Sequence, residues 1–213
     1  LSLERIGNAG CAAGVDSAEL GRGQLDFGRA PQDQATPAKR GPRRSIVMTL
    51  SIGLDFGTTN TVATMLNAQG AVEAVHFAHE QEAFDAFRSV LCFSETDDAA
   101  GRRTHTDAGP WAIDKFVELS GECRFIQSFK TFAASALFKD TQIYSRRMKF
   151  EDLLAGFLRR VKAHAGIEFP RRVVIGRPVS FAGAAPDEAL ARTRYEDALR
   201  AVGFEEIHHV YEP

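Results

Sequence analysis

The residues best suited to chemistry lie at 51–61, in the sequence SIGLDFGTTNT. Ile52 and Leu54 are spaced as the apolar positions of a buried strand. A carboxylate, a glycine, two hydroxyls and an amide follow, at Asp55, Gly57, Thr58, Thr59 and Asn60. Glycine lets the backbone approach a ligand closely, and successive N–H groups in a tight turn form a concave site for anions. These residues predict a phosphate-binding turn, in which Asp55 can hold hydrated Mg²⁺.

Two better-known phosphate loops are excluded by the spacing. A Walker A loop needs a Lys–Ser/Thr pair after its second glycine, and the dinucleotide motif needs three glycines in G-x-G-x-x-G. An ordinary hairpin, with Gly57 in the turn and the threonines in a second strand, explains Gly57 and two threonines equally well. The complete string, with a strand expected on both sides, favours the phosphate turn.

Two charged residues far from this turn are weaker candidates by themselves. Lys130 lies in the apolar stretch RFIQSFKTF, at residues 124–132. A lysine among aromatic residues usually extends its amine to water, so its residue context alone favours a structural role. Glu212 follows an expected strand, where a carboxylate is usually a cap or part of a solvated turn.

Composition narrows the class of protein. The chain has 213 residues, enough for one large domain or two small ones, and a formal net charge of −2. Such a charge argues against nucleic acid or an anionic membrane as the main partner. The three cysteines, Cys11, Cys92 and Cys123, are scattered without the spacing of a metal site. A reducing, cytoplasmic location is the simplest expectation.

Residues 1–47 differ from the rest of the chain. Glycine, alanine, arginine and short polar residues dominate there, without a sustained period of 2 or 3.6. Such a composition buries too little apolar surface to offset the entropy cost of ordering. We expect a disordered or non-native leader, with Met48 as the physiological start.

The remaining sequence predicts alternating strands and helices, an α/β class. The clearest helix is 150–166, where Phe150, Leu153, Leu154, Phe157 and Leu158 form an apolar stripe of helical period. A solvated loop is expected at 95–103, where acidic residues give way to basic ones. The other expected elements are strands at 48–54, 61–66, 71–77, 88–93, 173–175 and 206–211, and helices at 111–119 and 185–203.

The string Asp-Phe-Gly-Thr-Thr-Asn at 55–60 resembles the first phosphate loop of the actin-like ATPases, and within them of the DnaK-type heat-shock-70 chaperones. The sequence IGRPVSF at 175–181 is similar to the corresponding sequence in the YegD-like branch of that family. The resemblance covers residues 48–213 and has further matches at Pro178, Phe181, Arg192, Gly203-Phe204 and Glu212-Pro213. It implies a ribonuclease-H-like, actin-like ATPase lobe: a mixed five-stranded sheet flanked by helices. The stretch 133–149 is shorter than in the family, which implies a reduced covering subdomain.

The resemblance also implies cofactors, partners and roles for individual residues. ATP and Mg²⁺ would be the cofactors, with Asp55 holding the metal through water and Gly57, Thr58, Thr59 and Asn60 binding phosphates. Lys130 would act on the transferring phosphoryl group, and Glu212 would hold a metal-bound or attacking water. Pro178 and Arg192 would be switch residues, although Arg177 departs from the family pattern. ATP or ADP, unfolded protein clients and co-chaperones are the implied partners.

The family's second phosphate loop, Asp-apolar-Gly-Gly-Gly-Thr, does not occur in these 213 residues. We therefore expect 48–213 to be the first lobe of the ATPase domain, without the second, and to bind Mg–ATP poorly alone. In the complete protein, ATP hydrolysis would drive protein folding. Two alternatives stay open: a sugar kinase of the same superfold, and a non-catalytic actin-like module for binding or assembly.

Overall fold

The computed structural model describes residues 49–99, 101–181 and 185–212. The expected leader, the expected start at Met48 and the final Pro213 lie outside these described residues. Within the described residues, strands and helices are mixed along the chain, in agreement with the predicted α/β class.

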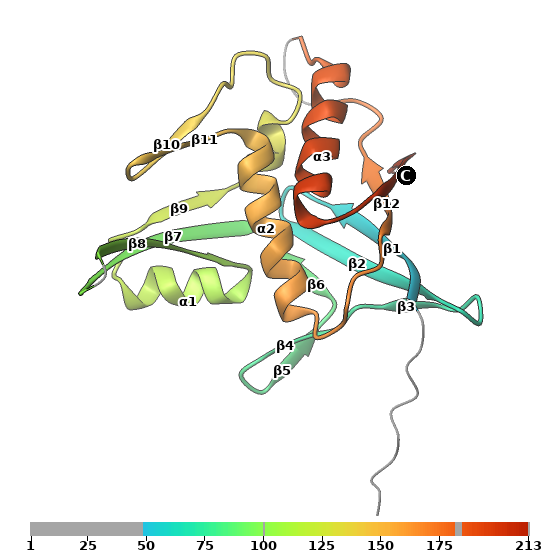
Figure 1. Ribbon diagram of the computed structural model, residues 1–213, viewed down its shortest axis with the longest axis horizontal. Coiled ribbons are helices and arrows are strands. Elements are labelled where there is room, and N and C mark those ends of the chain that lie inside the picture. Colours follow the sequence, from blue (N-terminus) through green and yellow to red (C-terminus); the bar gives the residue numbers. More distant parts are fainter. Residues whose placement is uncertain (1–48, 100, 182–184, 213) are drawn as a thin grey trace, which may run out of the picture. The chain divides into compact units, whose positions relative to one another are not determined.

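The main sheet holds the phosphate-turn candidate. Its strand order is β13-β12-β1-β2-β3, and β6 also pairs with β2 (Figure 1). The strands are β1 (Thr49–Phe56), β2 (Asn60–Asn67), β3 (Val72–Ala74), β6 (Ala86–Arg88), β12 (Arg172–Arg177) and β13 (Glu206–Tyr211). β12 is parallel to β1 and to β13, whereas β2 is antiparallel to its partners. The sheet is therefore mixed, with β6 as a sixth strand beyond the five expected.

The parallel strands explain why distant residues meet. β1, β12 and β13 run in one direction, so their carboxyl ends lie at the same edge of the sheet. Open α/β sheets bind ligands at that edge, outside the carboxyl ends of their strands. Asp55 lies near the end of β1, and Glu212 follows β13 directly.

Two long helices pack against each other beside this sheet (Figure 1): α2 (Phe150–His164) and α3 (Glu188–Val202). Both helices were expected, with small differences at their ends. The Asp187 carboxylate accepts a hydrogen bond of 2.9 Å from the backbone N–H of Leu190 and so caps α3. Pro186 consequently precedes α3 and does not lie in its first turn. Gly203, with φ of 103°, ends α3 in the left-handed conformation that glycine adopts easily.

The alternation along β1 separates a buried face from an open one. Ile52, Leu54 and Phe56 are at most 3% exposed. The Phe56 ring lies 5.6 Å from that of Phe157 in α2 and 6.1 Å from that of Tyr195 in α3. The carboxylate-bearing Asp55 is exposed. Because successive side chains of a strand point to opposite faces, the helices cover the core face and leave Asp55 on the other.

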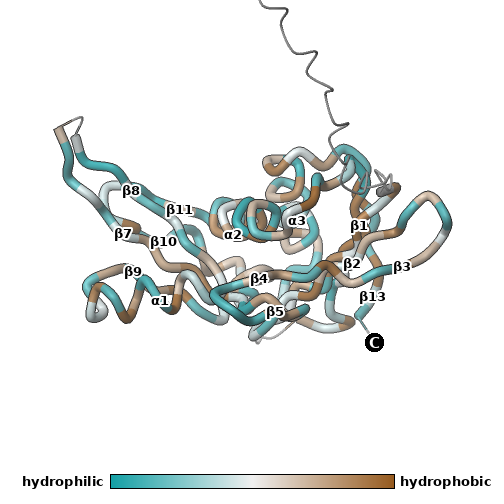
Figure 2. Tube along the Cα trace, turned by 90° about the horizontal axis from the view of Figure 1, so that it is seen from below, coloured by the Kyte–Doolittle hydropathy of each residue, from teal (hydrophilic) through white to brown (hydrophobic). Residues whose placement is uncertain are grey.

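A second sheet was missed by the sequence analysis. It has the order β8-β7-β9, formed by β7 (Val90–Asp98), β8 (Gly101–Ala108) and β9 (Arg124–Gln127), and it contacts α1 (Pro110–Glu118). The prediction of a loop at 95–103 is wrong, because residues 95–98 belong to β7 and residues 101–103 to β8, which pair as an antiparallel hairpin. β8 is largely hydrophilic (Figure 2). Opposite charges across the strands favour the pairing: Arg102 lies 3.8 Å from Asp97, which it faces in register.

The other elements are short. The strand expected at 71–77 divides into β3, paired with β2, and β4, paired with β5. A hairpin of two three-residue strands occupies part of 133–149, the stretch where a reduced subdomain was expected. These elements are β4 (Phe77–His79), β5 (Glu82–Phe84), β10 (Thr141–Ile143), β11 (Arg146–Met148) and the 3-10 helix η1 (Phe129–Phe132).

Candidate functional site

The turn between β1 and β2 is closed by a backbone hydrogen bond of 3.0 Å from the Gly57 N–H to the Asn60 carbonyl. A Cβ on Gly57 would lie 2.3 Å from that carbonyl oxygen, so the turn needs a glycine for space. Ser89, which the sequence analysis did not treat as a site residue, supports the turn. Its N–H donates to the Thr59 carbonyl at 2.9 Å, and its hydroxyl lies 2.9 Å from that of Thr61.

The turn leaves several donors available. Thr58, Thr59 and Asn60 are exposed. Within the described part of the chain, the backbone N–H groups of Thr58 and Thr59 have no hydrogen-bond acceptor. Unpaired N–H groups on consecutive residues, with hydroxyls beside them, are the features of a backbone anion site.

Lys130 and Glu212, which are 82 positions apart, meet in the structure. The Lys130 amine donates a hydrogen bond of 2.7 Å to Oε1 of Glu212. Lys130 is 8% exposed, and its amine lies 6.0 Å from the centre of the Phe56 ring. A left-handed residue, Ser128 with φ of 56°, turns the chain from β9 into η1 and so directs Lys130 inward.

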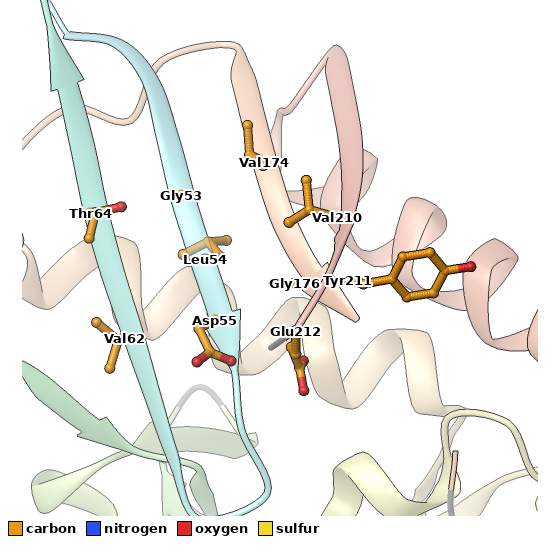
Figure 3. A pocket seen from close by; sticks show the side chains of 10 residues that line it. All are labelled: Gly53, Leu54, Asp55, Val62, Thr64, Val174, Gly176, Val210, Tyr211 and Glu212. Carbon is orange, nitrogen blue, oxygen red and sulfur yellow. The ribbon is translucent and has the colours of Figure 1, made fainter. Parts of the chain in front are cut away.

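Asp55 and Glu212 share one hollow of about 230 Å³ on the open face of the main sheet. Figure 3 shows their carboxylates at the same end of the sheet. The hollow is lined by Gly53, Leu54, Asp55, Val62, Thr64, Val174, Gly176, Val210, Tyr211 and Glu212. The structure therefore brings Asp55, Glu212 and, through Glu212, Lys130 to one end of the sheet.

Two glycines of this hollow were missed by the sequence analysis. A Cβ on Gly53 would lie 2.6 Å from the Thr64 hydroxyl, and one on Gly176 would lie 3.1 Å from Cγ of Glu212. Both lie within strands, where a glycine weakens pairing and often marks a close approach of another group. That signal was present in the sequence, in IGLDF and VIGRP.

Tyr195 lies behind the carboxylates, in α3. It is 1% exposed, and among the described residues its hydroxyl has no hydrogen-bond partner. Burial raises the pKa of Tyr195, and the negative charges of Glu212 and Asp55 raise this pKa further. Both carboxylates thus act on the same buried hydroxyl, which the structure keeps neutral.

The two expected switch residues are not joined to this cluster by any interaction found among the described residues. Pro178 follows β12 and is half-buried. Arg192 is exposed and forms an ion pair of 2.9 Å with Glu196 of its own helix. Arg177 has its own contacts, 4.1 Å from the centre of the Tyr211 ring and 3.5 Å from Glu188.

A buried arginine, Arg194, was also missed. It is 8% exposed, and its guanidinium donates four hydrogen bonds of 2.6–3.1 Å to backbone carbonyls just after Lys130. The accepting carbonyls belong to Phe132, Ala133, Ser135 and Phe138. Its position three residues after Ala191 on the apolar face of α3 was the available sign of burial. Arg194 thereby fixes the segment that carries Lys130 against α3.

No family model matches the chain. One solved structure that matches is a non-polymerising mutant of MamK bound to AMPPNP, with 18% sequence identity and a TM-score of 0.40. The match covers 78% of this chain and 42% of the MamK chain, so the present chain spans less than half of that protein. No helix in the described residues has the length and hydrophobicity to cross a membrane.

Proposed function

We propose that residues 48–213 are the first lobe of an actin-like ATPase domain and bind the phosphates of Mg–ATP at the carboxyl edge of the main sheet. The observation that carries this proposal is the hydrogen bond of 2.7 Å between Lys130 and Glu212 beside the hollow that also contains Asp55. A cation, two carboxylates and a glycine turn with available N–H groups lie at this edge of the sheet, and they come from three separate stretches of chain.

The groups present suit a magnesium-bound phosphate chain. Mg²⁺ prefers one or two carboxylates together with waters and phosphate oxygens. No three His, Cys, Asp or Glu side chains cluster as metal ligands within the described residues, so a full protein cage is absent from that part. Asp55 would hold the hydrated ion, and Glu212, which lines the same hollow, would bind one of its waters. When bound, Mg²⁺ would neutralise charge on the phosphate oxygens.

The residues of the chain have distinct tasks in this proposal. The N–H groups of Thr58 and Thr59 and their hydroxyls bind and orient the phosphates. Lys130 stabilises the negative charge of the transferring phosphoryl group. Glu212 accepts a hydrogen bond from Lys130 through one oxygen and has its second oxygen available to orient a water.

The finer proposal is a heat-shock-70-like chaperone of the YegD-like branch. It rests on the sequence matches at Pro178, Arg192 and 175–181, and on the meeting of Lys130 with Glu212. Under the sugar-kinase alternative, that meeting would have no function. Unfolded clients and co-chaperones would act on the complete protein, whose ATP hydrolysis should increase when an unfolded protein is added.

Backbone amide NMR shifts of the full chain test the phosphate site. We expect Mg–tripolyphosphate and Mg–ATP to shift Gly57, Thr58 and Thr59 with similar weak affinity, on the order of millimolar, because the hollow offers phosphate contacts and lacks a base pocket. Adenosine alone should shift none of them. Shifts with adenosine equal to those with ATP, or shifts confined to other residues, would overturn the proposal.

A matched pair of variants separates the site from general charge. Asp55→Asn should abolish the Mg²⁺ dependence of these shifts, because the neutral amide attracts the hydrated cation weakly. Asp197→Asn removes the same charge from an exposed position of α3 and should leave the titration unchanged. Equal effects of the two variants would show a general charge effect.

A further inference from the structure

Cys92 and Cys123 are separated by 31 positions in the sequence and are neighbours in the structure. Their sulfur atoms lie 2.9 Å apart, with the Cys92 thiol directed at Cys123, and both thiols are free. Cys92 lies in β7, and Cys123 immediately precedes β9, which pairs with β7. The pair lies in the second sheet, outside the hollow described above.

The two cysteines differ in access. Cys92 is fully buried in a small core with Val90 and Ala112 of α1. Cys123 is partly exposed. Two buried thiols would be ordinary small apolar side chains, whereas a partly exposed thiol next to a buried one can meet a reagent in solution and then be joined by its neighbour.

The turn between α1 and β9 holds Cys123 in place. The Gly121 N–H donates to the Phe116 carbonyl at 2.9 Å, and the Cys123 N–H donates to the Gly121 carbonyl at 2.8 Å. Ser120 and Gly121 both have positive φ, 50° and 82°, as a helix-ending turn requires. The position of Cys123 is therefore set by backbone hydrogen bonds and does not depend on a loose loop.

We propose that Cys92 and Cys123 are a reversible thiol–disulfide site, which closes by exchange with a small-molecule disulfide such as oxidised glutathione. The resulting bond ties β7 to the turn before β9. It closes a loop that contains β8 and α1, and it thereby restrains the opening of the second sheet.

The exchange has two balanced steps. The Cys123 thiolate attacks one sulfur of oxidised glutathione, so a Cys123–glutathione bond forms, the glutathione S–S bond breaks and one glutathione thiolate leaves. The Cys92 thiolate then attacks the Cys123 sulfur, the Cys92–Cys123 bond forms, and the second glutathione leaves. The two protein thiols lose two protons and two electrons, and the electrons reduce oxidised glutathione to two thiols.

The second step should be slow and should accelerate with pH. Burial, together with the hydrogen bond to Cys123, raises the pKa of the Cys92 thiol to about 12. Only the thiolate attacks, and below the pKa its fraction rises about tenfold for each pH unit. Attachment of glutathione to Cys123 removes the negative charge of its thiolate and weakens the sulfur as an acceptor for the Cys92 S–H, so both effects of Cys123 that raise the Cys92 pKa diminish.

The test is made on the full chain carrying Cys11→Ser, which removes the third thiol. The folded protein is incubated with oxidised and reduced glutathione, quenched in acid, and its free thiols are alkylated before intact-mass measurement. We expect loss of two hydrogens, no alkylation, recovery of both thiols with dithiothreitol, and a melting temperature higher by about 5–10 °C in the oxidised form. Two alkylated thiols at every glutathione ratio would overturn the proposal.

Two further variants identify the order of attack. In the same background, Cys92→Ala should stop at a stable glutathione adduct on Cys123, because the second nucleophile is gone. Cys123→Ala should acquire no adduct in the folded state, because Cys92 is fully buried. An adduct that accumulates on Cys123 without closing when Cys92 is present would also overturn the proposal.

Discussion

Lys130 and Arg194 are two cations that are each 8% exposed, but they differ in their hydrogen-bond partners. Arg194 donates four hydrogen bonds to backbone carbonyls of the segment 132–138. The Lys130 amine has three donors, and among the described residues Glu212 is its one hydrogen-bond partner. Both terminal nitrogens of Arg194 thus donate to backbone carbonyls, whereas Lys130 pairs with a carboxylate that lines the hollow and has donors remaining.

The difference indicates which buried charge is structural and which can serve a ligand. A buried charge costs free energy unless it is paired and hydrogen-bonded. Arg194 recovers that cost within the fold, so its removal should affect stability above all. The Lys130–Glu212 pair borders water, so its removal should affect ligand binding more than stability.

The largest effect should come from Arg194→Met. The variant removes four hydrogen bonds. The carbonyls of Ala133 and Phe138 lose their donor, whereas those of Phe132 and Ser135 keep backbone N–H donors at 3.2 Å, and we expect the free energy of unfolding to fall by about 3 kcal/mol. Urea unfolding monitored by circular dichroism measures the loss. The control is Arg192→Met, two residues away on the exposed face of α3, where loss of the ion pair with Glu196 should change stability by about 0.5 kcal/mol or less. Equal losses would remove the distinction between the two arginines.

Gly57→Ala should have the next largest effect on stability. Its Cβ would lie 2.3 Å from the Asn60 carbonyl oxygen, so the turn must deform; we expect a loss of about 2 kcal/mol and no amide shifts with Mg–tripolyphosphate. Gly156→Ala in α2 is the contrasting variant, since its nearest neighbour would be 4.0 Å away. It should gain about 0.5 kcal/mol from helix propensity. A Gly57→Ala protein of normal stability and phosphate response would show that the turn tolerates a side chain.

Lys130→Met tests whether Lys130, unlike Arg194, contributes more to ligand binding than to stability. The Glu212 carboxylate it leaves behind is 23% exposed and can be hydrated, so stability should fall by only about 1 kcal/mol. Affinity for Mg–tripolyphosphate should fall about tenfold, which corresponds to about 1.4 kcal/mol. Lys139→Met, at an exposed lysine nearby in the sequence, should change neither quantity. A stability loss as large as that of Arg194→Met, with unchanged affinity, would assign Lys130 to the structure alone.

The smallest effect on stability should come from titrating His164. This half-buried residue lacks, among the described residues, a hydrogen bond at Nε2 to offset its burial, whereas Arg194 has four hydrogen bonds. His164 stacks on Trp111 with ring centres 3.5 Å apart. Burial lowers the pKa of His164, and the charge of Arg160 lowers this pKa further. Between this lowered pKa and the ordinary value of about 6.5, the unfolded chain binds more protons than the folded one. The free energy of unfolding should therefore decrease, by less than about 1 kcal/mol, as the pH is lowered through this interval.

The His79 ring also lies 4.8 Å from the ring of Trp111, the single tryptophan, so fluorescence of Trp111 measures this titration in a His79→Gln background. Protonation of the stacked imidazole should quench it with a midpoint below 6.5, and His164→Gln should abolish the transition. A midpoint at or above the ordinary value would show that the ring is not held in its buried stack.

The elements around the site were predictable to different degrees. β13 begins and ends where expected. Both α2 and α3 follow clear apolar stripes, and α3 lies between an N-cap at Asp187 and a C-cap at Gly203. The strand expected at 88–93 overlaps the apolar start of β7, but the charged end of β7 and the whole of β8 were not predicted, because these residues owe their pairing to partners across the hairpin. Strand propensity reflects cross-strand neighbours more than the residue itself, so this error follows from the physics of sheets.

The sequence by itself determined the Gly57 turn and the presence of Asp55 beside it, because a contiguous string of residues sets the local backbone and its donors. Tertiary structure alone decided that Lys130 meets Glu212 and that Cys92 lies against Cys123. Each of these depends on the order and direction of strands and on which helix face meets the sheet. Those are long-range choices, made by the packing of the whole core and not by the neighbours of any residue in the chain.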